Sequence, residues 1–140
     1  MLYVDTSILV AALSNEAHTA AAQDWLGGQR GGALAISDWT IAEMSSALAI
    51  KLRRRELSLA VRNEALALFN GLVEDSFQVL SVSALDFRTA ARLADQHAAA
   101  LRAGDALHLA IASNRGMTLY TLDKGLAKAA QVGINTVLIA

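Results

Sequence analysis

The sequence contains no cysteine, no proline and no long apolar run. Without cysteine the chain cannot form a disulfide framework, a zinc ribbon or a thiol nucleophile, and this composition suits a cytoplasmic protein. No apolar run reaches the roughly 18 residues that a membrane-spanning helix needs. Residues 2–13 differ from a signal peptide because Asp5 interrupts them and no basic residue precedes them. We therefore expect a cytoplasmic chain that does not enter a membrane.

The sequence also lacks a strong net charge, which is −1. No global field attracts nucleic acid or anionic lipid, so RNA binding would depend on local basic residues and on metal. With 54% hydrophobic and 18% charged residues, the composition indicates a compact, helix-rich chain and excludes disorder. The length fits one domain, and no repeat or linker divides it. We expect a single domain over residues 1–140.

Short apolar segments typical of buried strands alternate with longer segments of helical period. The expected strands are 2–4, 33–37, 77–80, 118–121 and 134–139. The expected helices are 8–13, 18–26, 40–54, 58–74, 83–99, 103–114 and 123–130. Strands that alternate with helices form a mainly parallel sheet covered on both faces. The predicted fold class is therefore α/β, a three-layer α/β/α sandwich with a mainly parallel central sheet.

Four acidic residues lie far apart in the sequence, each where an expected strand ends or an expected helix begins: Asp5, Glu43, Asp105 and Asp123. The carboxyl ends of parallel strands open on one edge of a sheet, where such folds bind their ligands. Two carboxylates about 4 Å apart repel by roughly 4 kcal/mol at an effective dielectric of about 20. Four of them in one pocket would need a compensating cation, so the sequence predicts a divalent metal site.

Each acid also has an ordinary structural explanation. Asp5 and Asp123 could cap helices, and Glu43 could complete a capping box three residues into its helix. Asp105 could form an ion pair with Arg102 on the helix surface. Asp105 is the hardest to explain in this way, because the rest of its helix is apolar and a buried, unpaired carboxylate is costly. The four acids together are therefore more specific evidence for a metal site than any one of them alone.

The histidines and tryptophans carry weaker signals. His18, His97 and His108 have no metal-ligand spacing among themselves, so none is assigned a catalytic role. His108 follows Asp105 by three residues and could face the site, although a packed or surface position is the more common one for such a residue. Trp25 and Trp39 are expected in the core or at an interface rather than as platforms for base stacking.

Four segments carry a family resemblance: YVDTS at 3–7, IAEM at 41–44, LRAGDALHLA at 101–110 and TLDKGL at 121–126. In order and spacing they resemble the PIN-domain family, and in particular its compact branch, the VapC-type toxins of toxin–antitoxin pairs. The resemblance spans the entire chain. It implies a Rossmann-like sandwich, a metal-dependent endoribonuclease activity on an RNA substrate, a homodimer, and a cognate antitoxin whose C-terminal segment occupies the active-site groove.

By this resemblance the four acids form a catalytic Mg²⁺ or Mn²⁺ site: Asp5, Glu43, Asp105 and Asp123. Three hydroxyl residues would support it: Thr6, Ser7 and Thr121. Some relatives carry a further acid where this chain has Gly125, so the resemblance supports one metal ion, and a second ion could arrive only with the substrate phosphate. Arg102 and Lys124 flank the acids and are predicted to bind phosphate. Water activated by the cation would attack the phosphorus in line and leave a 5′-phosphate and a 3′-hydroxyl.

A basic cluster closes the expected helix 40–54 and consists of Lys51, Arg53, Arg54 and Arg55. Its position predicts either a solvated helix end, where cations suit the helix dipole, or a surface for RNA or the antitoxin. Both interpretations remain open at this point.

Other functions are weighed against the ribonuclease. A catalytically weak PIN-fold module could bind RNA or protein without metal-dependent cleavage. A phosphorylatable receiver domain also gathers acids at strand ends, but it needs adjacent acids after its first strand, where this chain has Thr6 and Ser7. Ser7 equally disfavours a haloacid-dehalogenase-type phosphatase, which needs a second aspartate two positions after the first.

Overall fold

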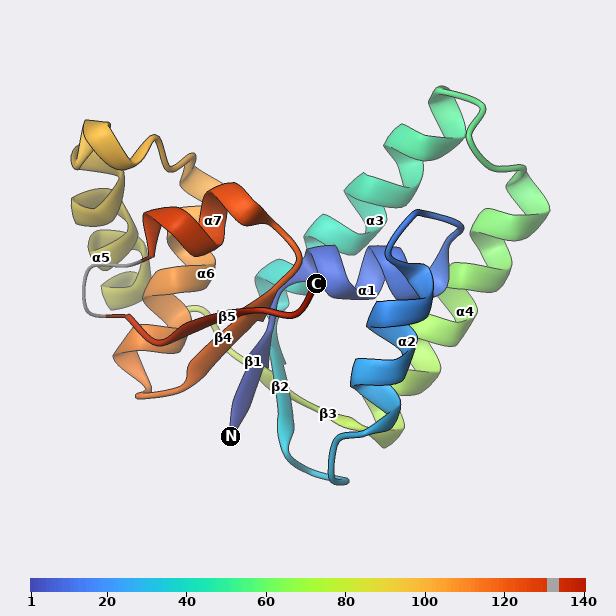
Figure 1. Ribbon diagram of the computed structural model, residues 1–140, viewed down its shortest axis with the longest axis horizontal. Helices are drawn as coiled ribbons and strands as arrows, with labels where there is room; N and C mark the ends of the chain where they lie inside the picture. The colour runs from blue at the N-terminus through green and yellow to red at the C-terminus, as the bar shows by residue number, and fades with distance from the viewer. Residues whose placement is uncertain (131–133) are drawn as a thin grey trace.

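The computed structural model, which describes residues 1–130 and 134–140, contains a five-stranded parallel sheet (Figure 1). The strands are β1 (Leu2–Val4), β2 (Leu34–Ser37), β3 (Phe77–Leu80), β4 (Thr118–Thr121) and β5 (Thr136–Leu138). Their order across the sheet is β3-β2-β1-β4-β5, and each neighbouring pair runs parallel. The expected parallel sheet is confirmed, with β1 at its centre.

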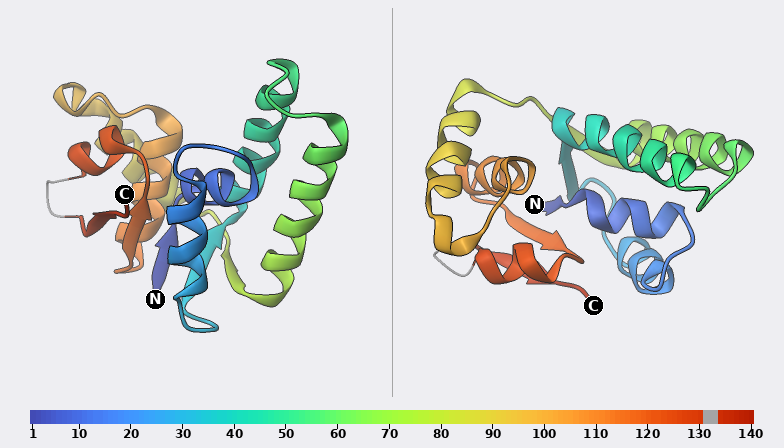
Figure 2. Two further views of the ribbon diagram at one scale, coloured as in Figure 1. Left: turned by 45° about the vertical axis from the view of Figure 1, so that its right-hand side comes forward. Right: turned by 90° about the horizontal axis from the view of Figure 1, so that it is seen from above.

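Helices cover both faces of the sheet, as the two views in Figure 2 make clear. They are α1 (Thr6–Leu13), α2 (Thr19–Gly27), α3 (Asp38–Arg53), α4 (Leu59–Asp75), α5 (Ala84–Asp95), the 3-10 turn η1 (His97–Ala99), α6 (Ala103–Asn114) and α7 (Lys124–Ala129). Side chains of α1 to α4 share one core, and side chains of α5 to α7 share another. The predicted three-layer α/β/α sandwich is therefore confirmed.

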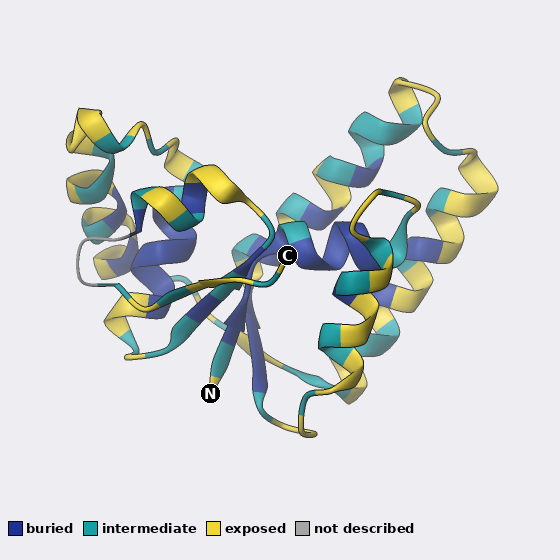
Figure 3. Cartoon of the chain, viewed as in Figure 1, coloured by how far each residue is buried: buried dark blue, intermediate teal, exposed yellow. Residues whose placement is uncertain are grey.

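The two cores lie on opposite faces of the sheet because successive strand residues point in opposite directions. On β1, Val4 packs into the core with α1, whereas Tyr3 packs into the core with α6. On β4, Leu119 joins Tyr3, whereas Tyr120 packs on the Val4 side. Figure 3 shows that the central strands, α1 and much of α6 are buried. Among the described residues, no helix combines the length and the apolar character that crossing a membrane requires.

Helices α3 and α4 form an antiparallel pair that extends beyond the sheet (Figure 1). Helix α3 begins at Asp38, two residues before the expected start. Its capping box is made by Ser37 and Thr40, where the Ser37 backbone N–H donates to Thr40 Oγ1 at 3.1 Å. Glu43 therefore lies inside the helix, and a capping-box role for this glutamate is wrong.

Helix α5 ends earlier than the predicted helix 83–99. Its start is as expected, because Ser83 and Asp86 form a reciprocal capping box. Its end differs because Gln96 leaves the helical region with φ −76° and ψ 74°, and Ala100 takes a left-handed φ of 54°. These two residues redirect the chain so that α6 can pack back against α5. The alanines at 98–100 favour a helix locally, but this reversal of direction overrides that preference.

Candidate acidic active site

The four predicted acids come from four separate elements and line one open cleft of about 540 Å³. Asp5 directly follows β1, Glu43 lies on α3, Asp105 lies in the first turn of α6, and Asp123 precedes α7. The cleft opens at the carboxyl ends of β1 and β4, where open parallel sheets bind ligands. The structure therefore brings all four together, while their role in metal binding and catalysis stays a prediction.

Asp5 is buried, with 4% of its surface exposed, and its carboxylate is held by hydroxyl groups. Ser7 Oγ donates to Asp5 Oδ2 at 2.6 Å, and Thr121 Oγ1 donates to the same oxygen at 2.7 Å. Asp5 occupies the N-cap position of α1, but its side chain accepts no capping hydrogen bond. The capping explanation for Asp5 is therefore wrong, since its carboxylate is fixed across the sheet edge instead.

Glu43 is fixed through one of its two oxygens. Thr6 Oγ1 donates to Glu43 Oε1 at 2.7 Å, and His108 Nε2 contacts the same oxygen. Burial alone would raise the pKa of Glu43, but the hydrogen bond and charge of His108 lower the pKa overall. The side chain is therefore a carboxylate at neutral pH, with Oε1 anchored to the protein.

Asp105 is the acid whose charge is least favourable. Burial raises the pKa of its carboxyl to about 6, and the negative charges of Asp5 and Asp123 add to this effect. Among the described residues, no ion pair joins Asp105 to Arg102, whose side chain is exposed. The ion-pair explanation for Asp105 is therefore not supported, and a cation in the cleft would relieve the repulsion.

Asp123 does cap a helix, as its ordinary explanation predicts. Its Oδ1 accepts a hydrogen bond from the Leu126 backbone N–H at 3.1 Å, and its own N–H donates to Thr121 Oγ1 at 2.9 Å. A Cβ added at Gly125 would lie 3.2 Å from Asp123 Oδ1. The cap orients the carboxylate while Asp123 still lines the cleft, so the two roles coexist.

His108 is a residue of the site that the sequence analysis considered, because it could face the site, but to which it assigned no role. It lies on α6 one turn after Asp105 and is fully buried. Its Nδ1 lies 2.7 Å from Tyr3 Oη, and its Nε2 lies 3.7 Å from Asp5 Oδ1 as well as touching Glu43. Burial would lower the pKa of His108, but the hydrogen bond to Glu43 and the nearby acids raise it overall. Two features of the sequence pointed to this position: His108 follows Asp105 by three residues, and it is a polar residue within a mostly apolar helix.

The donor set fits a hard divalent cation. All four acids offer carboxylate oxygens, which Mg²⁺ and Mn²⁺ prefer. The raised pKa of Asp105 shows that its charged form is disfavoured, first by burial and then by the negative charges of Asp5 and Asp123. Within residues 1–130 and 134–140, no three His, Asp or Glu side chains already form a ligand cluster. A bound cation would thus draw the repelling carboxylates toward itself rather than enter a closed cage.

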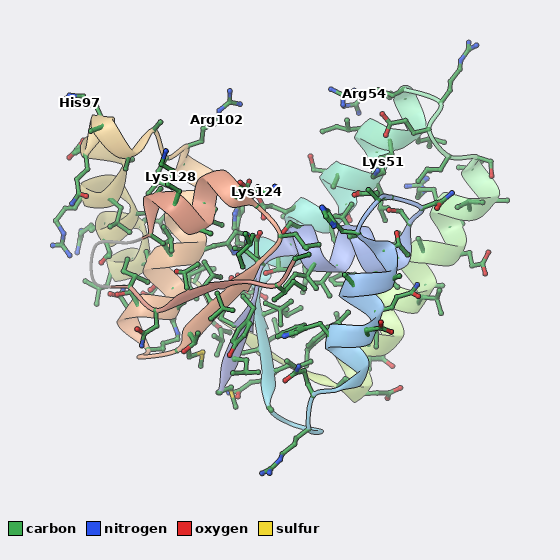
Figure 4. The ribbon with its side chains drawn as sticks, viewed as in Figure 1. Lys51, Arg54, His97, Arg102, Lys124 and Lys128 are labelled. Atoms are coloured by element: carbon green, nitrogen blue, oxygen red, sulfur yellow. The ribbon has the colours of Figure 1, made fainter. Side chains whose placement is uncertain are left out.

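Cations stand on both sides of the molecule in Figure 4. Arg102 and Lys124 lie at the starts of α6 and α7, and both side chains are exposed. On α3, Lys51 pairs with two glutamates, Glu16 at 3.1 Å and Glu56 at 3.6 Å. Lys51 is therefore occupied by acids, so the basic cluster has its free charge on its exposed arginines: Arg53, Arg54 and Arg55.

A further carboxylate, Asp86, lies outside the cleft and holds α5 against α6. Arg115 donates to both of its oxygens, at 2.9 and 3.0 Å, and Asn114 Nδ2 donates to Oδ1 at 2.9 Å. Burial would raise the pKa of Asp86, but these bonds hold it well below its ordinary value. Fully satisfied by protein donors and almost completely buried, Asp86 is a structural acid.

Comparison with known proteins identifies relatives over almost the whole chain. The PIN domain family matches residues 2–132. VapC20 of Mycobacterium tuberculosis, described as a sarcin-ricin loop cleaving toxin, superposes with a TM-score of 0.74 at 19% identity, covering 96% of this chain and 99% of its own. PAE2754 of Pyrobaculum aerophilum has a TM-score of 0.69 at 27% identity, covering 98% and 83%. VapBC-5 of Mycobacterium tuberculosis, a member of the VapBC family of toxin-antitoxin systems, has a TM-score of 0.63 at 20% identity, covering 99% and 96%. No curated protein matches the sequence.

Proposed function

Because the chain belongs to the PIN-domain family, we propose that it is a metal-dependent endoribonuclease of the VapC type, the toxin of a toxin–antitoxin pair. One observation carries the proposal: four carboxylates from four elements line a single cleft, where burial, together with the negative charges of Asp5 and Asp123, raises the pKa of Asp105 to about 6. Asp86, a structural acid, is paired with Arg115, whereas among the described residues no lysine or arginine forms an ion pair with any of the four cleft acids. The cleft instead has an excess of negative charge.

The four acids have different roles in the proposed reaction. Asp5 and Asp105 are the first choices as direct ligands of Mg²⁺ or Mn²⁺, and Glu43 and Asp123 would bind the ion or orient the water. When bound, the cation supplies an activated water and stabilises charge on the phosphate. Ser7 and Thr121 hold the second oxygen of Asp5, as their hydrogen bonds of 2.6 and 2.7 Å indicate.

The RNA phosphates would be held by basic side chains outside the acids. Arg102 and Lys124 are exposed at the starts of α6 and α7, three residues before Asp105 and one residue after Asp123 in the sequence. With a net charge of −1 for the whole chain, local cations of this kind must offset the repulsion between RNA and the acidic cleft. Reaction by water attack would leave a 5′-phosphate, independent of the ribose 2′-hydroxyl.

The proposed partners are an antitoxin and a second copy of the chain. A cognate antitoxin is supported by the likeness in fold to VapBC-5, whose family is named for toxin–antitoxin systems. A homodimer is proposed by family resemblance, and light scattering of the purified chain would test it. A short neighbouring gene that encodes a DNA-binding segment and a disordered tail would support the toxin assignment. We also propose a single domain over residues 1–140 and a cytoplasmic location.

The experiment is cleavage of a panel of structured and single-stranded RNAs with Mg²⁺, with Mn²⁺ and with chelator. The wild-type chain is compared with Asp5→Asn and Asp105→Asn, and with Asp24→Asn as the control, because Asp24 is exposed on α2 away from the cleft. Cleavage should need the metal, should be lost in the first two variants only, and should leave 5′-phosphates.

Two results would oppose the proposal in different ways. Cleavage that persists in chelator, or a 2′,3′-cyclic phosphate product, would exclude metal-activated water. RNA binding without cleavage under every condition would favour the alternative, a catalytically weak PIN-fold module for RNA or protein.

A further inference from the structure

His108 joins the buried core to the rim of the cleft. Its ring is completely buried, although it belongs to a helix that starts at the site. One edge of the ring faces Tyr3 Oη, 2.7 Å from Nδ1. The other edge faces Glu43 Oε1 and lies 3.3 Å from Thr6 Oγ1. The imidazole is thus held at both nitrogens, by partners 105 and 65 residues away in the sequence.

The partners determine which atom carries the proton. A carboxylate oxygen only accepts hydrogen bonds, so the contact with Glu43 Oε1 requires an N–H at Nε2 of His108. On the opposite edge, Tyr3 Oη also lies 2.8 Å from Ser37 Oγ, which is fully buried. Rotating or flipping the ring would leave buried polar atoms without hydrogen-bond partners, which destabilises the fold. The ring orientation is therefore fixed from the core.

Glu43 needs such support because of its position. It lies on α3, half-buried at the cleft, where a glutamate has several accessible rotamers. Two donors, Thr6 Oγ1 and His108 Nε2, converge on Oε1. The other oxygen, Oε2, lies beside Gly104, where an added Cβ would be 3.2 Å away. Anchoring one oxygen thus leaves a single defined direction for the other.

We propose that His108 is a positioning residue for Glu43, and that Tyr3, backed by Ser37, fixes the ring that does so. The sequence of contacts Ser37–Tyr3–His108–Glu43 runs from the centre of the fold to the cleft. These contacts would present Glu43 to the cation, and this role rests on the proposed metal-dependent function. The ordering of Glu43 itself does not depend on that function and can be measured without metal.

The first test uses NMR of the metal-free chain with labelled glutamate side chains. In the wild type, Glu43 should give one ordered carboxyl signal, and His108 should show a proton on Nε2 that is protected from exchange with water. In His108→Leu, the Glu43 side chain should become rotationally averaged, whereas His108→Gln, which can still donate an N–H, should restore its order. The matched control is His97→Leu, because His97 is exposed far from the cleft (Figure 4). Equal order of Glu43 in wild type and His108→Leu would overturn the proposal.

The second test measures Mn²⁺ binding by calorimetry. His108→Leu should weaken binding by about 10–100-fold, the usual effect of removing a residue that orients a metal ligand. In a Glu43→Gln background the same change should have almost no further effect, because His108 acts through Glu43. Effects that simply add would show that His108 acts independently of Glu43 and would refute the positioning role.

A third variant covers the case in which His108→Leu does not fold. Tyr3→Phe keeps the ring volume and removes only the hydroxyl that faces Nδ1. It should lower the order of Glu43 partially and weaken Mn²⁺ binding less than His108→Leu does, again only while Glu43 is present. If the wild type binds no Mn²⁺ but the NMR result holds, the proposed function fails and the positioning role stands.

Discussion

Replacing Asp105 by asparagine should stabilise the metal-free chain near neutral pH. The cleft raises the pKa of Asp105 from 3.8 to about 6, because its carboxyl is partly desolvated and lies near Asp5 and Asp123. That difference corresponds to at most about 3 kcal/mol. The side chain is half exposed, so solvent screening reduces the expected gain to about 1 kcal/mol.

The sign of the effect depends on pH. An aspartate whose pKa is raised by folding favours the folded state when protonated. This contribution is fully present below about pH 4 and is lost as the pH rises through about 6. Asparagine is neutral at every pH, so the variant should be more stable than the wild type at pH 7.5 and nearly equal to it at pH 4.

Urea unfolding followed by circular dichroism, in chelator, would measure both free energies. Asp24→Asn is the matched control, since it removes the same charge from an exposed site on α2 and should show no such pH dependence. Adding Mn²⁺ should then raise the unfolding midpoint of the wild type more than that of Asp105→Asn. A variant no more stable than the wild type at pH 7.5, or one stabilised equally by Mn²⁺, would refute the electrostatic reasoning.

Further predictions concern the buried acid Asp86 and the two predicted phosphate-binding residues, Arg102 and Lys124. Arg115→Ala should lower the free energy of unfolding by about 3 kcal/mol, measured in urea, because it leaves the buried Asp86 without its cation. Since the pKa of Asp86 is lowered, its contribution is present above about pH 4 and should decline in acid, a decline that Asp86→Asn should lack. Lys124→Ala and Arg102→Ala should each raise the KM for RNA with kcat nearly unchanged, and should reduce the slope of log affinity against log salt by about 0.7. Unchanged salt slopes would remove these two residues from the RNA-binding surface.

The order of elements could be predicted from the sequence because each apolar segment matched its eventual environment. Helix α6 illustrates this, since every residue from Ala106 to Ala112 is buried. Helix ends were less predictable, because they depend on competition between neighbouring caps. At the start of α3, Ser37 and Thr40 form the capping box, which leaves Glu43 in the second turn of the helix, where it lines the cleft.

Three of the candidate acids could be found from the sequence because Asp5 follows a strand and Asp105 and Asp123 lie at helix starts, whereas Glu43 lies inside α3. The supporting contacts could not, because they join residues that are distant in the sequence. Nothing near His108 in the sequence indicates that its partners are Tyr3 and Glu43, which become neighbours only when β1 and α3 pack against α6. The cap formed by Asp123 was local and therefore predictable.

The central position of β1 protects the backbone that carries Asp5 against local unfolding. β1 is hydrogen-bonded to β2 on one side and to β4 on the other, and it leads directly into Asp5. Amides in such a strand exchange with solvent only when most of the molecule unfolds. Partial opening at α4 would thus leave the Asp5 backbone in place, and this part of the proposed cation site should be lost only with the global fold.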